Sequence, residues 1–171
     1  LNVKVLALQD IYNEFSSGQQ DVGAIRNMVK YVYFNASSET NRLKYLCLFG
    51  DASYDYKNRI SNNTNIVPSW LSYSSFNLTN SYISDDFYGC MDDNEGNLEH
   101  NASSPYKLDV AVGRILADTP QRAKELVDKI ELYYKESSYG SWRNNYVLIS
   151  DDLGSTGERV IQSTTDEMAD E

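Results

Sequence analysis

The segment KYLCLFGD (44–51) decides the fold class of this 171-residue chain. Its apolar run extends from Tyr45 to Phe49 without a break, and Gly50-Asp51 closes it. A short continuous apolar run bounded by turn residues is typical of a strand buried in a parallel sheet. We therefore predict a strand here, with Asp51 at its carboxyl end.

Three further runs of this kind predict strands along the chain. They are VKVLAL (3–8), LDVAVGRI (108–115) and NNYVLIS (144–150), the last closed by Asp151-Asp152. In parallel sheets ligands gather at the carboxyl ends of the strands. Asp151 and Asp152 could there act as acid/base groups, helix caps or metal ligands.

Helical spacing appears between these runs. Asp21 is the expected N-cap of a helix from Val22, and Thr119-Pro120 opens a second one. A last helix is expected from about Glu158. The apolar faces of the first two comprise Val22, Ile25, Met28, Val29, Val32 and Tyr33, and then Ala123, Leu126, Ile130 and Tyr133. The alternation predicts an α/β fold with a mostly parallel sheet flanked by helices.

Residues 52 to about 106 form a long insertion without strong periodicity, so we expect either short hidden elements or a function of its own. Within it, SDDFYGCMDDNEGNLEH (84–100, the acidic loop) carries six carboxylates, while no Lys or Arg lies between Arg59 and Lys107. Because like charges this close repel one another, three alternatives remain, namely a bound metal ion, a basic partner surface or a solvated loop.

A hard cation such as calcium suits the acidic loop, because alternate oxygen-bearing residues of a curled loop can point inward. Gly96 permits the tight turn, although EF-hand spacing fails because its first ligand position falls on Met91. The candidate ligands are Asp92, Asp93, Glu95, Asn97 and Glu99.

Composition and motifs exclude several classes of function. The net charge of −10 argues against nucleic acid as a partner. No apolar stretch is long enough to span a membrane, and no phosphate-binding loop or zinc spacing occurs. Cys47 is expected to be a free, buried core residue. Cys90 lies among carboxylates that raise a thiol pKa, so a Cys90–His100 catalytic dyad is not expected.

Five segments together resemble the gingipain-type (C25) cysteine peptidases. They are DIYNEFSSGQQDVGAIRNMVKYVY (10–33), LKYLCLFGDASYDYKNR (43–59), SDDFYGCMDDNEG (84–96), LDVAVGRILADTPQRAKELVDKIELYY (108–134) and WRNNYVLISDD (142–152). The resemblance implies a caspase-like α/β domain of two subdomains, of which residues 1–171 would be the N-terminal one. Both ends of the chain fall inside predicted elements, so we expect a piece of a larger protein.

The resemblance also implies roles for particular residues. The catalytic Cys and His would lie downstream of Glu171, so the fragment alone would be inactive. Asp152 matches a carboxylate beside the catalytic His, although gingipains have Glu there and Asp has a shorter reach. Calcium would lie between Asp51 and the stretch from Asp92 to Glu99, with Asp51, Asp92, Asp93, Glu95 and Asn97 as ligands.

The function implied by the resemblance is that of a cysteine endopeptidase at the cell surface. The sortase-like members of the family serve type IX secretion in Bacteroidetes, where they remove a C-terminal sorting domain from secreted cargo and transfer the cargo to an anionic lipopolysaccharide. The alternatives are a pseudo-peptidase without the dyad, and a non-enzymatic α/β binding module that uses its tyrosine-rich, acidic insertion. In the full peptidase, the partners would be the polypeptide substrate and the remainder of the domain.

Overall fold

A computed structural model describes residues 2–74, 76–77, 79–98, 107–150 and 158–170. The chain divides into two compact units, residues 1–128 and 129–171. The helix α3 (Pro120–Tyr134) contributes to both units. Each unit is described by itself below.

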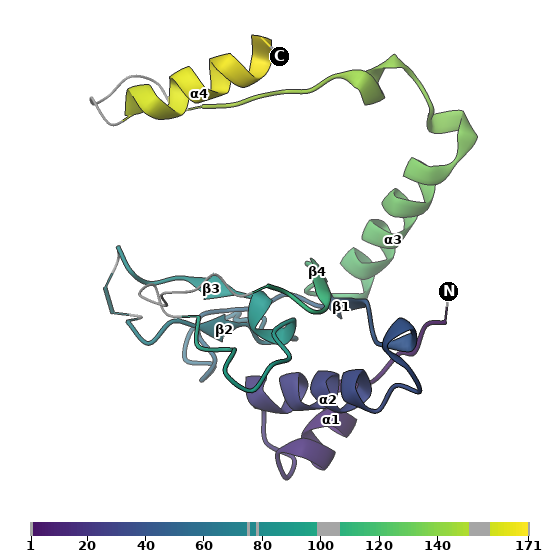
Figure 1. Cartoon of the computed structure of the whole chain (residues 1–171), viewed down its shortest axis with the longest axis vertical. Coiled ribbons are helices and arrows are strands. Elements are labelled where there is room, and N and C mark those ends of the chain that lie inside the picture. The colour runs from purple at the N-terminus through teal and green to yellow at the C-terminus, as the bar shows by residue number, and fades with distance from the viewer. Residues whose placement is uncertain (1, 75, 78, 99–106, 151–157, 171) are drawn as a thin grey trace. The chain divides into compact units, whose positions relative to one another are not determined.

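A parallel pair of strands forms the centre of the first unit (Figure 1). These strands are β1 (Tyr45–Phe49) and β4 (Ala111–Ile115), aligned from Tyr45↔Ala111 to Phe49↔Ile115. The prediction of β1 is confirmed residue for residue. β4 begins three residues later than predicted, because Asp109 and Val110 donate their backbone N–H groups to the carbonyl of Gly89 instead.

Two helices, α1 (Leu8–Phe15) and α2 (Val22–Phe34), cover one face of this sheet. Their buried side chains form a core with Leu48 of β1, since side chains alternate between the two faces of a strand. The members of this core are Ile11, Tyr12, Ala24, Ile25, Leu48, Val67 and Tyr88. Cys47 points to the opposite face and is exposed, so the prediction that it is a buried core residue is wrong.

The N-terminus of α2 follows the sequence prediction. The carboxylate of Asp21 accepts a hydrogen bond from the backbone N–H of Gly23 at 2.7 Å, which satisfies one of the unpaired donors of the first turn. Ile25 and Val29 are buried as expected, whereas Val32 is exposed. The buried face is therefore centred on the side of α2 that includes Ala24.

The long insertion contains short elements, as one of the two alternatives predicted. β2 (Trp70–Leu71) pairs antiparallel with β3 (Ile83–Ser84), and the 3₁₀ helix η2 (Asp86–Tyr88) follows. The buried Trp70 ring lies 5.7 Å from the ring of Tyr82 and 6.4 Å from that of Phe87. This aromatic cluster connects the hairpin with η2.

Two predicted strands are wrong within the described residues. Residues 3–7 are unpaired, with Val3 and Val5 exposed, and Leu8 already begins α1. Residues 145–150 are likewise unpaired and Ile149 is exposed. Both runs are apolar and β-branched, but a strand also needs a neighbour for its backbone hydrogen bonds, and the described residues provide none.

α3 begins as predicted, because the Thr119 hydroxyl accepts a hydrogen bond from the backbone N–H of Arg122 at 3.2 Å. Its predicted apolar face is not covered, since no residue of α3, which is described throughout, is buried. Ile130 and Tyr133 are exposed and Leu126 is half-buried. The amphipathic pattern therefore predicted the helix correctly but not its packing.

The second unit contains the end of α3 and the helix α4 (Glu158–Asp170). Between them lie two 3₁₀ helices, η3 (Glu136–Ser138) and η4 (Ser141–Asn144). The 3₁₀ helix η1 (Glu39–Asn41), like η2, belongs to the first unit. The Arg143 guanidinium carbon lies 4.2 Å from the ring centres of both Tyr133 and Tyr139. Among the described residues, no helix combines the length and the apolar character needed to cross a membrane.

Candidate functional site

The carboxyl ends of β1 and β4 are joined beyond the ladder itself. Gly50 donates its N–H to the carbonyl of Ile115 at 2.9 Å, and Asp51 donates to that of Ala117 at 3.1 Å. The Val67 N–H in turn donates to the Asp51 carbonyl at 2.9 Å. The insertion therefore returns to this rim, where parallel sheets usually bind their ligands.

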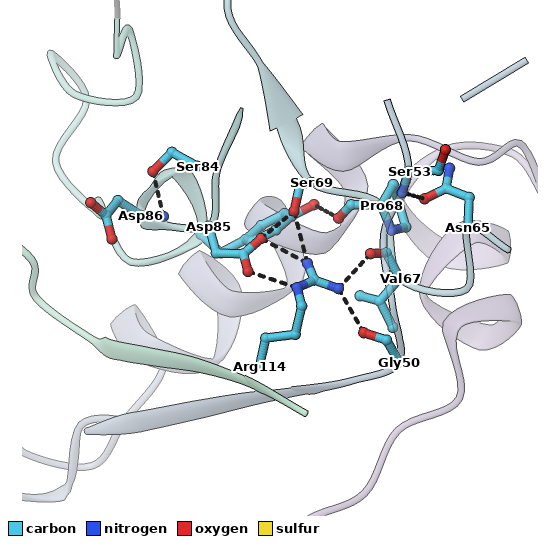
Figure 2. Close-up of polar contacts among 11 residues, drawn as sticks. Gly50, Ser53, Asn65, Val67, Pro68, Ser69, Ser84, Asp85, Asp86 and Arg114 are labelled. Atoms are coloured by element: carbon cyan, nitrogen blue, oxygen red, sulfur yellow. Dashed lines mark hydrogen bonds and ion pairs between the residues drawn. The ribbon is translucent and has the colours of Figure 1, made fainter. Parts of the chain in front are cut away.

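Arg114 of β4 is the centre of the polar network at the rim (Figure 2). Its Nε and Nη2 donate to the two carboxylate oxygens of Asp85, each at 2.7 Å. Nη2 also donates to the Ser69 hydroxyl at 3.0 Å, and Nη1 donates to the carbonyls of Gly50 and Val67 at 2.8 and 2.7 Å. These contacts account for all five N–H donors of the guanidinium.

The network keeps Asp85 ionised. Burial alone would raise the pKa of this carboxyl, but hydrogen bonds from Arg114 and Ser69 outweigh burial and hold the pKa below its ordinary value. The side chains of Arg114 and Asp85 are only 9% and 24% exposed. Because its donors are already used, Arg114 fits a structural role, which is to fasten the insertion to the sheet.

Tyr88 extends the same network into the core. Its hydroxyl donates to the carbonyl of Pro68, and the side chain is fully buried. Burial first, and then the charge of Asp85, raise the pKa of this phenol, so it stays neutral. The Tyr88 hydroxyl therefore acts as a fixed hydrogen-bond donor in the core.

A half-open polar cavity of about 240 Å³ adjoins the rim. Asp55 in its wall accepts backbone hydrogen bonds from Arg59 and Ile60, at 2.5 and 2.6 Å. The side-chain nitrogen of Asn65 is buried and has no hydrogen-bond partner among the described residues. The cavity is lined by Gln20, Asp55, Tyr56, Asn58, Asn63 and Asn65. It offers amide donors and acceptors beside the carboxyl end of β1.

Asp51 has one carboxylate oxygen that could take a cation. Its Oδ2 accepts a hydrogen bond from the Thr64 hydroxyl. Its Oδ1 is buried and has no hydrogen-bond partner in the described part of the chain. A buried, unpaired carboxylate oxygen is costly, so this atom fits a metal ligand.

The acidic loop reaches the other end of the sheet. Gly89 accepts hydrogen bonds from the N–H groups of Asp109 and Val110, and the Met91 N–H donates to the Asp109 carboxylate at 3.0 Å. These contacts lie at the amino end of β4, whereas Asp51 follows the carboxyl end of β1.

The structure therefore does not bring the predicted calcium ligands together. Asp92, Asp93, Glu95 and Asn97 follow Met91, which contacts Asp109 at the amino end of β4, whereas Asp51 follows the carboxyl end of β1. Over the described ranges, no three His, Cys, Asp or Glu side chains are grouped so that they could hold a metal ion. Of the predicted ligand set, the Oδ1 atom of Asp51 is the one that fits a cation by its surroundings.

The surroundings of the two described cysteines differ. Both are free, and Cys90 is buried. Burial, followed by the charge of Glu95, raises the pKa of the Cys90 thiol to about 11, so almost no nucleophilic thiolate forms at neutral pH. His100 and Glu99, as well as Asp151 and Asp152, lie outside the described residues.

Sequence reasoning missed two arginines that organise this region, Arg114 and Arg26 of α2. Arg114 follows a glycine in a predicted strand, and a charged residue within an apolar run is a signal for a buried partner. Arg26 donates hydrogen bonds to backbone carbonyls of the acidic loop. One of them belongs to Cys90, which is 64 residues from Arg26 in the sequence. Nothing in the local pattern around Arg26 indicates that contact.

Comparisons with known proteins agree with this architecture. The family model described as peptidase family C25 matches residues 1–171. Among solved structures, the chain resembles the crystal structure of dimeric latent PorU from Porphyromonas gingivalis, with 24% sequence identity and a TM-score of 0.60. The similarity covers 91% of this chain but only 15% of that one. No curated protein matches the chain. At this identity, the structural likeness shows a shared fold.

Proposed function

The chain belongs to peptidase family C25, and from this premise we propose that it is the N-terminal subdomain of a gingipain-type cysteine peptidase. The observation that carries the proposal is the family match over residues 1–171. The nucleophilic Cys and its His base would lie outside these residues. The thiolate would attack a peptide carbonyl and form an acyl-enzyme, with His as base and then as acid.

Residues 1–171 would supply the scaffold and one edge of the substrate cleft. The raised pKa and the burial of Cys90 support the idea that this residue is not the nucleophile. Asp152 would orient the catalytic imidazole and stabilise its charged form, which is the role of the third member of a triad. The Arg114 network would hold the insertion in place beside that cleft.

The substrate and location follow from the likeness to PorU and belong to the same proposal. The full protein would process secreted cargo with a C-terminal sorting domain at the cell surface of a Bacteroidetes-type bacterium. The chain spans about 15% of PorU, so this activity concerns the whole protein and not residues 1–171 alone.

Calcium forms part of the proposal at Asp51. The buried Oδ1 atom, which lacks a hydrogen-bond partner among the described residues, supports a cation there. Such an ion would be structural, because it would stabilise the turn that connects β1 with the insertion.

The direct test is peptide hydrolysis by the full-length protein and by variants of its cysteines. C47S and C90S should keep wild-type activity, and replacement of one Cys outside residues 1–171 should abolish it. Asp152→Ala should lower kcat more than Asp152→Glu does. A protein that folds, binds cargo and shows no thiol-dependent hydrolysis would be a pseudo-peptidase. Loss of activity in C90S with the fold intact would contradict the assignment of the nucleophile.

A further inference from the structure

The acidic loop contacts positively charged side chains that come from another part of the chain. The nearest basic residues in the sequence are Arg59 and Lys107, yet the described loop contacts two basic side chains of α2, Arg26 and Lys30. We propose that the Arg26 guanidinium takes the place of a metal ion in this loop, so that the loop keeps its shape without a divalent cation. This inference does not depend on peptidase activity.

Three backbone carbonyls of the loop converge on Arg26. Its Nε and Nη2 donate to the carbonyl of Cys90 at 2.9 and 2.7 Å. Nη2 also donates to the carbonyl of Glu95 at 3.0 Å and reaches that of Asp92 at 3.4 Å. Backbone carbonyls of a curled loop are also typical calcium ligands, so the guanidinium meets the same kind of oxygen set.

The space around the guanidinium is closed on two further sides. The ring centre of Phe87 lies 5.2 Å from the guanidinium carbon, a cation–π distance. Gly96 lies against the same group with a φ of +95°, and a Cβ atom added there would be 2.8 Å from the guanidinium carbon. A metal ion at these carbonyls would therefore displace Arg26 and would also be repelled by its charge.

The loop carboxylates have partners of their own in this arrangement. Glu95 accepts a hydrogen bond from the backbone N–H of Asp92 at 3.1 Å, which closes the turn. Asp93 pairs with Lys30 at 3.0 Å and is fully exposed. Glu95 therefore closes the turn and Asp93 faces solvent, and these described contacts do not direct the two carboxylates toward a shared centre. This differs from the calcium site that the family resemblance implies for the same residues.

The test is amide hydrogen exchange of residues 90–98 in the full-length protein, read by mass spectrometry. In Asp51→Ala, which lacks the calcium site proposed above, loop exchange should be the same in excess calcium and in EDTA. Arg26→Ala should speed loop exchange by roughly tenfold or more, since charge-assisted hydrogen bonds are lost. Lys30→Ala is the matched control, because it removes another cation of the same helix, whose partner Asp93 is fully exposed, and should change exchange little.

Chemical rescue gives a second readout. Guanidinium ion, added well below denaturing concentrations, should restore part of the protection in Arg26→Ala, while calcium should not. The loop amides of Arg26→Lys should be less protected from exchange than those of the wild type, because an ammonium group cannot reproduce the planar fork of the guanidinium. Faster loop exchange of Asp51→Ala in EDTA than in calcium would overturn the proposal, and that comparison decides the matter even if Arg26→Ala does not fold.

Discussion

Asp85 and Arg114 form a largely buried, bidentate ion pair, with both carboxylate oxygens 2.7 Å from guanidinium nitrogens. The pair joins the loop after β3 to the penultimate residue of β4, and the remaining Arg114 donors reach Gly50, Val67 and Ser69. One side chain thereby connects the sheet to two separate parts of the insertion, at residues 67–69 and at Asp85. We expect the insertion to be stable only while this pair is intact.

Asp85→Asn should lower the free energy of unfolding by about 3 kcal/mol, because it leaves a buried guanidinium without its counter-charge. Urea denaturation of the full-length protein followed by fluorescence measures this change. Asp93→Asn removes the same charge from a fully exposed carboxylate that pairs with Lys30, and it should change stability little. Equal losses in the two variants would contradict the role assigned to Asp85.

The Asp85 carboxyl should also make stability depend on acid pH. Its pKa is lower in the folded protein than its ordinary value, so its contribution is present above the unfolded pKa of about 3.9 and is lost as pH falls through the folded pKa. The stability difference between the wild type and Asp85→Asn should therefore shrink below about pH 4. A difference that stays constant down to acid unfolding would show that Asp85 is not the titrating group.

The two cysteines should react with thiol reagents at very different rates. Cys47 is exposed, whereas Cys90 is buried and its pKa is raised to about 11. At pH 8 iodoacetamide should label Cys47 first, and Cys90 should become labelled only after denaturation. Peptide mapping distinguishes the sites, and C47S shows any remaining native reactivity of Cys90.

Calcium should raise the melting temperature if it binds at Asp51, because a ligand of the folded state alone stabilises that state. Asp51→Ala should remove the gain, and Asp92→Ala should keep it, since the two residues lie at different ends of the sheet. Differential scanning fluorimetry in calcium and in EDTA gives the comparison. An unchanged calcium response in Asp51→Ala would remove the proposed site.

Local patterns were sufficient wherever a structural feature depends on neighbouring residues. The apolar run of β1, the Asp21 cap of α2 and the Thr119 cap of α3 all match their predictions. α1 could have been predicted in the same way, since Leu8, Ile11, Tyr12 and Phe15 have the spacing of one helix face. The strand predicted over residues 3–8 concealed that pattern.

Features that depend on distant residues could not be predicted from spacing. Arg114 and Asp85 are 29 residues apart, and Arg26 is 64 residues from Cys90. No Lys or Arg lies within the acidic loop, and α2 supplies a positive charge to it through packing. Spacing likewise does not show where the acidic loop lies relative to Asp51, because an insertion can cross from one end of a short strand to the other.

A substitution at Gly89 tests whether the acidic loop packs against the amino end of β4, because the chain passes that end of the strand at this residue. A Cβ atom on Gly89 would lie 2.5 Å from the carbonyl oxygen of Val110 and 3.0 Å from side-chain carbons of Leu108 and Val112. Since the closest contact is with backbone, the strand itself would have to move, and Gly89→Ala should cost about 2 kcal/mol.

Gly113→Ala is the matched control for this substitution. Gly113 lies within β4, and a Cβ atom there meets no described atom within 4 Å. The two variants have the same composition and differ only in the space that the added methyl group finds. Urea denaturation should show a loss for Gly89→Ala and little change for Gly113→Ala. Equal stability of the two would mean that the acidic loop does not pack against the amino end of β4 as the structure describes.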